Sequence, residues 1–208
     1  QVLRLGLGHA ERTLLTYEDN DTLREPVAVQ RETWRPTTRP QPERKLEMGP
    51  MILCVDTSGS MEGSPIELER AAVKAIAATL RQGDIVSAVT WSVGQTAMLD
   101  GYTVTAPNDP TLVNLADSLE ASGGTDLNGG LQAGYALAKQ YKAPGRINRV
   151  ILISDGQANV GVTEEEIIGA AANDQDAEGI YLVGVGVGDG INDTLMDTVT
   201  DAGRGAYI

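Results

Sequence analysis

The chain is poor in the side chains that most enzyme and zinc sites use. Its 208 residues include one cysteine, Cys54, and one histidine, His9. A single cysteine excludes an internal disulfide and a cysteine-rich zinc site. Without a second histidine, His-based zinc chemistry and a Ser-His-Asp triad are both disfavoured. Cys54 stands within the apolar run Ile-Leu-Cys-Val, where we expect a buried structural thiol rather than a reactive one.

Large apolar side chains and long apolar runs are also scarce. Phenylalanine is absent and aromatic residues make up 4% of the chain, so the core must be built from Ala, Val, Ile and Leu. No apolar run approaches the roughly 20 residues that span a bilayer, so we expect no membrane insertion. The chain starts at Gln1 without a signal-peptide pattern. We interpret it as a fragment, in which a missing targeting signal says nothing about the full gene product.

Positive charge is in short supply after residue 49. Residues 1–49 carry eight basic and eight acidic side chains, whereas residues 50–208 carry eight basic and 21 acidic ones. The net charge of −13 therefore lies entirely in residues 50–208. Such a surface repels nucleic-acid phosphates and anionic lipid, so we expect no nucleic-acid partner. It favours cations and basic protein surfaces instead.

Strand and helix patterns alternate regularly through residues 50–208. We expect strands at 51–55, 85–91, 96–104, 150–153, 180–187 and 206–208, and helices after Ser64, at 112–119, at 127–141, after Thr163 and at 193–202. This alternation predicts an α/β fold with a doubly wound, mostly parallel sheet flanked by helices. The segment 96–104 is expected to be its one antiparallel edge strand.

Two helix starts and the chain ends carry further expectations. Ser64–Glu67 resembles a capping box with Pro65 at the first helical position, and Thr163–Glu166 is expected to cap a later helix. The helix after Ser64 is expected to bury one face, made of Leu68, Ala71, Ala72, Ala75, Ile76 and Leu80. Residues 1–49, with Trp34 as the large apolar anchor, are interpreted as a polar amino-terminal arm. The chain ends as the last strand begins, so we expect a closing carboxy-terminal helix to be missing.

Oxygen-bearing side chains follow several of these strands or open the next helix. Asp56, Ser58 and Ser60 form an Asp-x-Ser-x-Ser turn directly after the first strand. Gly123-Gly124-Thr125-Asp126 precedes a helix, and Ser154-Asp155-Gly156 ends a later strand. In doubly wound sheets, ligands bind beyond the carboxyl ends of the strands, where these motifs fall. Carboxylate and hydroxyl oxygens suit a hard cation such as Mg²⁺, so the sequence predicts a metal site there.

Two competing interpretations fail on detail. The run Gly184–Gly190 resembles a dinucleotide loop, but no register gives Gly-x-Gly-x-x-Gly, and a tightly packed strand exit fits it better. Asp56-Thr57-Ser58 resembles a phosphatase with an aspartyl nucleophile, but that chemistry needs a second aspartate at the position of Ser58. We therefore expect a binding protein and not an enzyme.

With these motifs in order, residues 50–208 resemble the von Willebrand factor A domain family, in its bacterial type. The family's metal-ion-dependent adhesion site uses Asp-x-Ser-x-Ser, a threonine in a later loop and an aspartate after a central strand. The matching residues here are Asp56, Ser58, Ser60, Thr125 and Asp155, so all five positions are filled. The resemblance implies that the serines and the threonine contact the metal and that the two aspartates often act through water.

The resemblance also implies a function. The cation is expected to be Mg²⁺, with Mn²⁺ and Ca²⁺ as alternatives, and to coordinate a Glu or Asp carboxylate of a partner protein. The alternative is a structural or regulatory adaptor, for example for a MoxR-type ATPase, whose metal only stabilises the loops. The body of the domain is similar to extracytoplasmic bacterial members, which favours a secreted, periplasmic or cell-surface location. Residues 34–54 are more similar to cytoplasmic members that work beside MoxR-type ATPases. The sequence indicates no oligomeric state.

Overall fold

A computed structural model describes residues 48–161 and 179–208. In chain order, the elements are β1 (Met48–Asp56), the 3-10 turn η1 (Gly59–Met61), α1 (Ser64–Thr79), β2 (Ile85–Trp91), β3 (Gln95–Thr103), α2 (Pro110–Asp117), α3 (Leu127–Tyr141), β4 (Ile147–Ser154), β5 (Ile180–Gly186) and α5 (Asp193–Ala202). No helix among these residues is both long and apolar enough to cross a membrane.

A single five-stranded sheet forms the centre, in the order β3-β2-β1-β4-β5. β1 pairs in parallel with β2 and with β4, and β4 pairs in parallel with β5. β3 runs antiparallel to β2 at the edge, as predicted. The chain builds outward from β1 to one side and then crosses to β4 on the other. The fold is therefore the predicted doubly wound α/β arrangement, with its switch point between β1 and β4.

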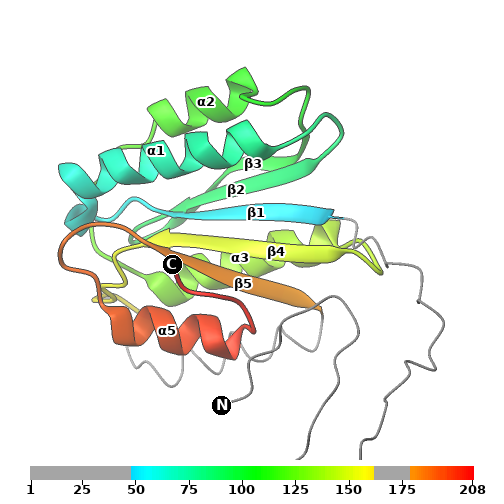
Figure 1. The fold of residues 1–208 in the computed structure, drawn as a ribbon. Coiled ribbons are helices and arrows are strands. Elements are labelled where there is room, and N and C mark those ends of the chain that lie inside the picture. Colours follow the sequence, from blue (N-terminus) through cyan, green and yellow to red (C-terminus); the bar gives the residue numbers. More distant parts are fainter. Residues whose placement is uncertain (1–47, 162–178) are drawn as a thin grey trace, which may run out of the picture. The chain divides into compact units, whose positions relative to one another are not determined.

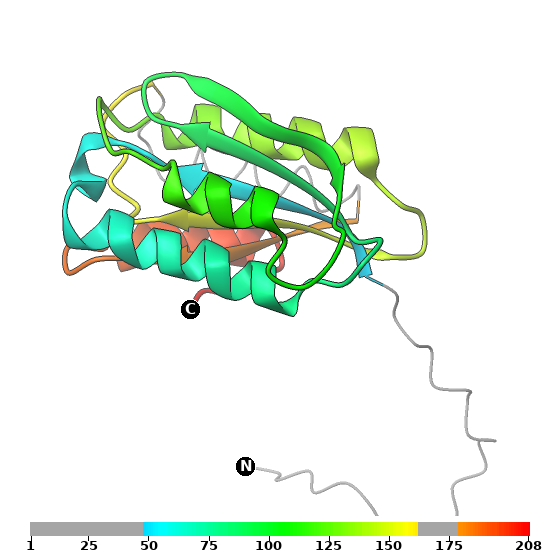
Figure 2. The ribbon, with the colours of Figure 1, turned by 90° about the horizontal axis from the view of Figure 1, so that it is seen from above.

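Helices cover both faces of this sheet. α1 and α2 lie on one face, and α3 and α5 lie on the other (Figure 1), an arrangement also visible from above (Figure 2). Successive side chains of a strand point to opposite faces, so β1 supplies both cores. Cys54 belongs to the core beneath α3 and α5, and Val55 to the core beneath α1 and α2. Burial on both faces explains why β1 is a continuous apolar run.

The start and the buried face of α1 differ from the sequence prediction. The N-cap is Gly63, with φ of 86°, and no side chain caps the helix, so the predicted capping box is wrong. Pro65 does stand in the first turn, as expected. The predicted apolar face is only half right: Ala72, Ile76 and Leu80 pack into the core, whereas Leu68, Ala71 and Ala75 are exposed. The buried residues of α1 are Ile66, Glu69, Val73 and Ala77.

Predictions for α3, α5 and the last strand agree with the structure, and others fall outside the described residues. α3 and α5 have the predicted bounds, and Asp126 caps α3 by accepting a hydrogen bond from the Gly129 amide at 3.0 Å. Tyr207 forms a parallel bridge with Gly184, so residues 206–208 do begin to pair with β5. Gly184 packs so closely that an added Cβ would lie 2.6 Å from Thr200, which fits a packed strand exit. His9, Trp34 and Thr163–Glu166 lie outside the described residues.

Candidate metal centre

The Asp56 carboxylate organises the turn that follows β1. It is fully buried, and its Oδ1 accepts a hydrogen bond from the Ser58 amide at 2.9 Å. Its Oδ2 accepts a hydrogen bond from the Ser154 hydroxyl at 2.6 Å. Burial raises the pKa of Asp56 to about 6, because these hydrogen bonds only partly offset the loss of water and the charge of Asp155 adds to it. The carboxylate thus holds the turn through these bonds, and no described side chain supplies it with a compensating positive charge.

Ser58 and Ser60 place two hydroxyls side by side above Asp56. Their Oγ atoms lie 3.1 Å apart, with Ser58 fully buried and Ser60 half-buried. Adjacent oxygens of an octahedral Mg²⁺ shell, with bonds near 2.1 Å, are separated by about 3 Å. The spacing of this hydroxyl pair therefore matches two neighbouring positions around such a cation.

Backbone hydrogen bonds join this turn to the loop that carries Thr125. The Gly59 amide donates to the Gly123 carbonyl at 2.9 Å, and the Ser122 amide donates to the Thr57 carbonyl at 2.8 Å. A Cβ on Gly59 would lie 2.8 Å from the Gly123 carbonyl oxygen. Gly59 is therefore required by the close approach of the two loops, since a side chain there would separate them.

Thr125 is buried and is held by Asn159. The Thr125 amide donates to Asn159 Oδ1 at 2.9 Å, and Asn159 Nδ2 donates to Thr125 Oγ1 at 3.4 Å. The amides of Asn159 and Val160 both donate to the Thr125 carbonyl at 3.1 Å. These bonds fix the threonine between its own loop and the segment after β4. The long bond to Oγ1 leaves that oxygen free to accept a stronger partner.

Asp155 follows β4 next to Ser154. It is buried, its Oδ1 accepts a hydrogen bond from the Gln157 amide at 3.0 Å, and its carbonyl accepts one from the Asn192 amide at 2.8 Å. Asp155 and Asp56 stand after neighbouring strands, so their negative charges reinforce one another. The structure thus brings five predicted residues to the carboxyl ends of the parallel strands: Asp56, Ser58, Ser60, Thr125 and Asp155.

Three polar residues at this edge were missed by the sequence analysis: Ser154, Asn159 and Glu69. Ser154 stood in the motif Ser-Asp-Gly but was given no role, although it holds Asp56. Asn159 carries no sequence signal, because its position depends on the loop after β4 folding back onto Thr125. Glu69 could have been found, since it lies in register with Ile66 and Val73 on the buried face of α1.

The donor set fits a hard divalent cation held through hydroxyls. Within residues 48–161 and 179–208, no group of three or more His, Cys, Asp or Glu side chains is arranged to hold a metal. A cation at this edge would therefore contact the oxygens of Ser58 and Ser60, with the carboxylates acting mostly from outside. The buried, uncompensated charge of Asp56 supplies the electrostatic reason for a cation to bind here.

A comparison with known protein families identifies the domain that contains this candidate site. The model described as the von Willebrand factor type A domain matches residues 51–208. The chain belongs to this family. Among curated relatives, the VWA domain is 30% identical over 170 residues to the uncharacterised protein YfbK of Escherichia coli, covering 79% of this chain and 29% of YfbK. It is 25% identical over 165 residues to the uncharacterised protein sll0103 of Synechocystis, covering 79% of this chain and 38% of that protein. The chain thus spans well under half the length of these relatives.

Solved structures share the fold at low identity. A von Willebrand factor type A structure from Catenulispora acidiphila matches with a TM-score of 0.63 and 19% identity, covering 77% of this chain and 38% of that one. Proximal thread matrix protein 1 of the mussel byssus, described with a zinc-occupied MIDAS motif, matches at 0.59 and 18%, covering 78% and 44%. Manganese-loaded TRAP protein of Plasmodium vivax matches at 0.60 and 18%, covering 78% and 68%. These matches support the VWA fold of the chain.

Proposed function

We propose that this VWA domain binds a protein partner through a divalent cation held at a metal-ion-dependent adhesion site. The observation that carries the proposal is the Ser58–Ser60 hydroxyl pair, 3.1 Å apart above a buried, uncompensated Asp56. Ser58, Ser60 and Thr125 would contact the cation, and Asp56 and Asp155 would hold its water molecules. Mg²⁺ is the proposed cation, with Mn²⁺ and Ca²⁺ as alternatives.

The chemistry of the donors favours an acidic partner. Hydroxyls are neutral ligands, so they leave most of the positive charge of a cation uncompensated along the direction that faces solvent. A bound cation supplies one open coordination position there, which a Glu or Asp carboxylate of the partner can fill. Residues 50–208 carry 21 acidic and eight basic side chains, so this part of the chain is acidic as a whole. The net negative charge would therefore repel an acidic partner, and the bound cation would attract it. The cation would thus determine where the partner binds.

Relatives support a metal at this position. The mussel thread protein is described with zinc in its MIDAS motif, and the Plasmodium protein is described as manganese-loaded. We further infer that the domain binds a partner and does not catalyse a reaction. Cys54, the nucleophile with the greatest intrinsic reactivity in the chain, is buried, and burial raises the pKa of its thiol far above the neutral range.

Selection of peptide ligands tests the proposal without the partner having to be identified first. The immobilised chain would be used to select from a random peptide library in 5 mM MgCl₂. We expect the selected peptides to share an Asp or Glu, and to lose binding in EDTA or when that residue is changed to Asn or Gln. Peptides that bind equally well in EDTA would contradict the metal-bridged interaction.

Two variants separate this mechanism from its alternative. Ser58→Ala removes a proposed metal contact, and Ser118→Ala is the matched control, because Ser118 is exposed and its hydroxyl donates to the carbonyl of Leu115. We expect Ser58→Ala alone to abolish selection of acidic peptides. If metal still raises the unfolding temperature of the wild-type chain while no acidic peptide is selected, the metal only stabilises the loops. That result would favour the structural or regulatory adaptor.

A further inference from the structure

Glu69 is a buried carboxylate on α1 for which the proposed site has no role. It lies on the inner face of the helix, between Ile66 and Val73, and its side chain is fully buried. No side chain among the described residues hydrogen-bonds either carboxylate oxygen, and the one backbone group that acts on them is that of Asp56. Buried polar groups are nearly always hydrogen-bonded, and an exception indicates an unmade contact with water or an ion. Glu69 therefore needs an explanation.

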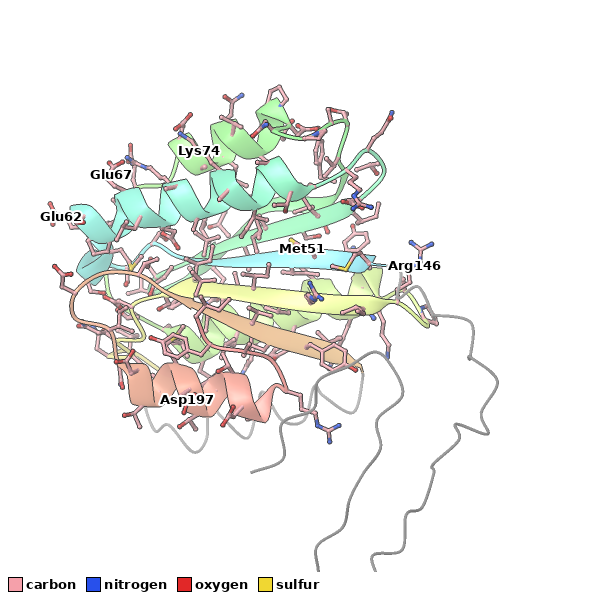
Figure 3. All side chains as sticks on the ribbon, viewed as in Figure 1. Met51, Glu62, Glu67, Lys74, Arg146 and Asp197 are labelled. Atoms are coloured by element: carbon pink, nitrogen blue, oxygen red, sulfur yellow. The ribbon has the colours of Figure 1, made fainter. Side chains whose placement is uncertain are left out.

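Within the part of the chain that the structure describes, no basic side chain supplies that contact. The ion pairs found there join Arg70 to Glu67 at 2.6 Å and Lys74 to Asp117 at 2.5 Å. Both ion pairs include a residue of α1. The side chains of Glu67 and Lys74, however, point away from the sheet (Figure 3). A buried carboxylate without a cation is costly, because it loses the hydration that water would give it. No described side chain offsets this cost, and a cation bound nearby would do so.

The candidate metal centre lies in the same neighbourhood. α1 begins four residues after Ser60, so one continuous segment carries the hydroxyl pair and Glu69. The pKa of Glu69 is raised well above its usual range, first by burial and then by the negative charge of Asp56; a hydrogen bond from the Asp56 backbone opposes the rise, and the charge of Asp155 adds to it. Those are the two carboxylates proposed to hold the water molecules of the cation. Glu69 is thus a third buried acid beside the turn that carries Asp56.

We propose that Glu69 is a sixth residue of the metal centre: an anionic group beneath the direct ligands that raises the affinity for the divalent cation. This inference rests on the proposed function, since it assigns a further residue to the same site. The absence of a three-carboxylate metal-holding group among the described residues places Glu69 outside the direct ligands. It would act by its charge and by accepting hydrogen bonds from water bound to the cation.

Calorimetric titration of the purified chain with manganese chloride tests the assignment. Glu69→Gln keeps the size of the side chain and removes its charge. We expect the affinity for Mn²⁺ to fall by roughly 10- to 100-fold, as for other residues that support metal ligands indirectly. Glu67→Gln is the matched control, because it makes the same change on the same helix at a side chain that is 67% exposed. It should bind Mn²⁺ as the wild type does.

The outcomes distinguish this inference from the proposed function. If the wild type and Glu69→Gln bind Mn²⁺ with equal affinity, Glu69 is not part of the centre, while the metal site itself stands. If the wild type binds no Mn²⁺, both the site and the role of Glu69 are wrong. Loss of affinity in Glu69→Gln alone supports the inference.

A second variant, Glu69→Leu, tests the role of Glu69 in the metal centre if Glu69→Gln folds poorly. In EDTA, leucine should raise the unfolding temperature above that of the wild type, because it removes a buried carboxylate without a partner. In saturating MnCl₂, the difference should shrink or reverse, because the wild type gains more from the cation. A purely structural role for Glu69 would give the same difference in both buffers, which would overturn the inference.

Discussion

Asp56, Glu69 and Asp109 are all buried, and they differ in how many donors they meet. Asp109 caps α2 and accepts hydrogen bonds from the amides of Thr105 and Thr111, and from the hydroxyls of Thr105 and Tyr102. Asp56 accepts two hydrogen bonds, and Glu69 accepts none from a described side chain. Hydrogen bonds lower the pKa of Asp109, whereas burial raises the pKa of Asp56 to about 6 and raises that of Glu69 well above its usual range.

Asp109 makes the stability of the domain depend on pH in a defined direction. Because hydrogen bonds from Thr105 hold the pKa of Asp109 below its unfolded value of about 3.9, its stabilisation is present above that pH. It is lost as the pH falls from about 4 through the folded pKa. We expect Asp109→Asn to be less stable than the wild type by a constant amount from pH 5 to 8, and by a shrinking amount below pH 4. Urea unfolding in EDTA, followed by circular dichroism, measures the difference.

The matching control is Asp117→Asn, whose side chain is 56% exposed and pairs with Lys74 at the surface. It should change the free energy of unfolding little at any pH. A difference between the wild type and Asp109→Asn that stays unchanged down to pH 3 would show that the Asp109 charge contributes nothing.

Residue identity alone predicted the candidate metal oxygens but not the residues that hold them in place. Asp56, Ser58, Ser60, Thr125 and Asp155 were predicted from motifs, because hard oxygens in Asp-rich turns are locally visible. Ser154 and Asn159 hold Asp56 and Thr125 through contacts between distant segments. Such contacts leave no local pattern, whereas Glu69 interrupts the otherwise apolar buried face of α1.

At the scale of elements, α3 packs on the sheet through two glycines that differ in how much space an added side chain would have. A Cβ at Gly130 would collide with the indole ring of Trp91 on β2, and the Gly130 carbonyl accepts the Cys54 thiol at 3.2 Å. A Cβ at Gly134 would meet Cys54 and Val150 at 3.4 Å, close to ordinary contact. The close approach of α3 to the sheet therefore depends on Gly130 more than on Gly134.

These glycines form a matched pair within one helix. We expect Gly130→Ala to destabilise the domain by about 1–3 kcal/mol, because the packed indole cannot move without strain. Gly134→Ala should be neutral or stabilising by up to about 1 kcal/mol, since alanine favours the helix. Urea unfolding of both variants in EDTA measures the effect. If both variants lose the same stability, the helix tolerates no side chain at either position and the distinction is wrong.

α1 shows why an apolar pattern can point to the wrong face. Its small residues Ala71 and Ala75 suggested a buried stripe with Leu68, but the sheet contacts Ile66, Val73 and Ala77 instead. Alanine is compatible with either face of a helix, so it defines the orientation weakly. The bond from Arg70 Nε to the Leu119 carbonyl, at 3.2 Å, and the pair of Lys74 with Asp117 tie the other side to the α2 region.

At the scale of the whole domain, the metal centre draws on three loops at one edge of the sheet. β1 and β4 are neighbours in the sheet, although Asp56 and Asp155 are 99 positions apart in the chain. The Thr125 loop joins them through Gly59 on one side and Asn159 on the other. A cation held by all three loops would add a further link between them.

Removal of the metal should therefore lower the stability of the entire domain. At a free cation concentration 100 times the dissociation constant, binding to the folded state adds about 2.7 kcal/mol. We expect the unfolding temperature to rise on adding MgCl₂ or MnCl₂ and to return in EDTA, as measured by differential scanning calorimetry. Ser58→Ala should show a much smaller rise. An equal rise in Ser58→Ala would locate the cation elsewhere, for example on the acidic surface.

The sequence by itself determined the alternation of strands and helices, the parallel sheet with its antiparallel edge, and the oxygen-bearing turns. These are local properties: an apolar run, a turn and a helix start are each encoded by adjacent residues. Only the tertiary structure decided that Ser154 supports Asp56, that Asn159 holds Thr125 and that Glu69 is buried on the inner face of α1. These relations depend on which distant segments pack together, because burial and loss of water arise from the assembled fold and not from neighbouring residues.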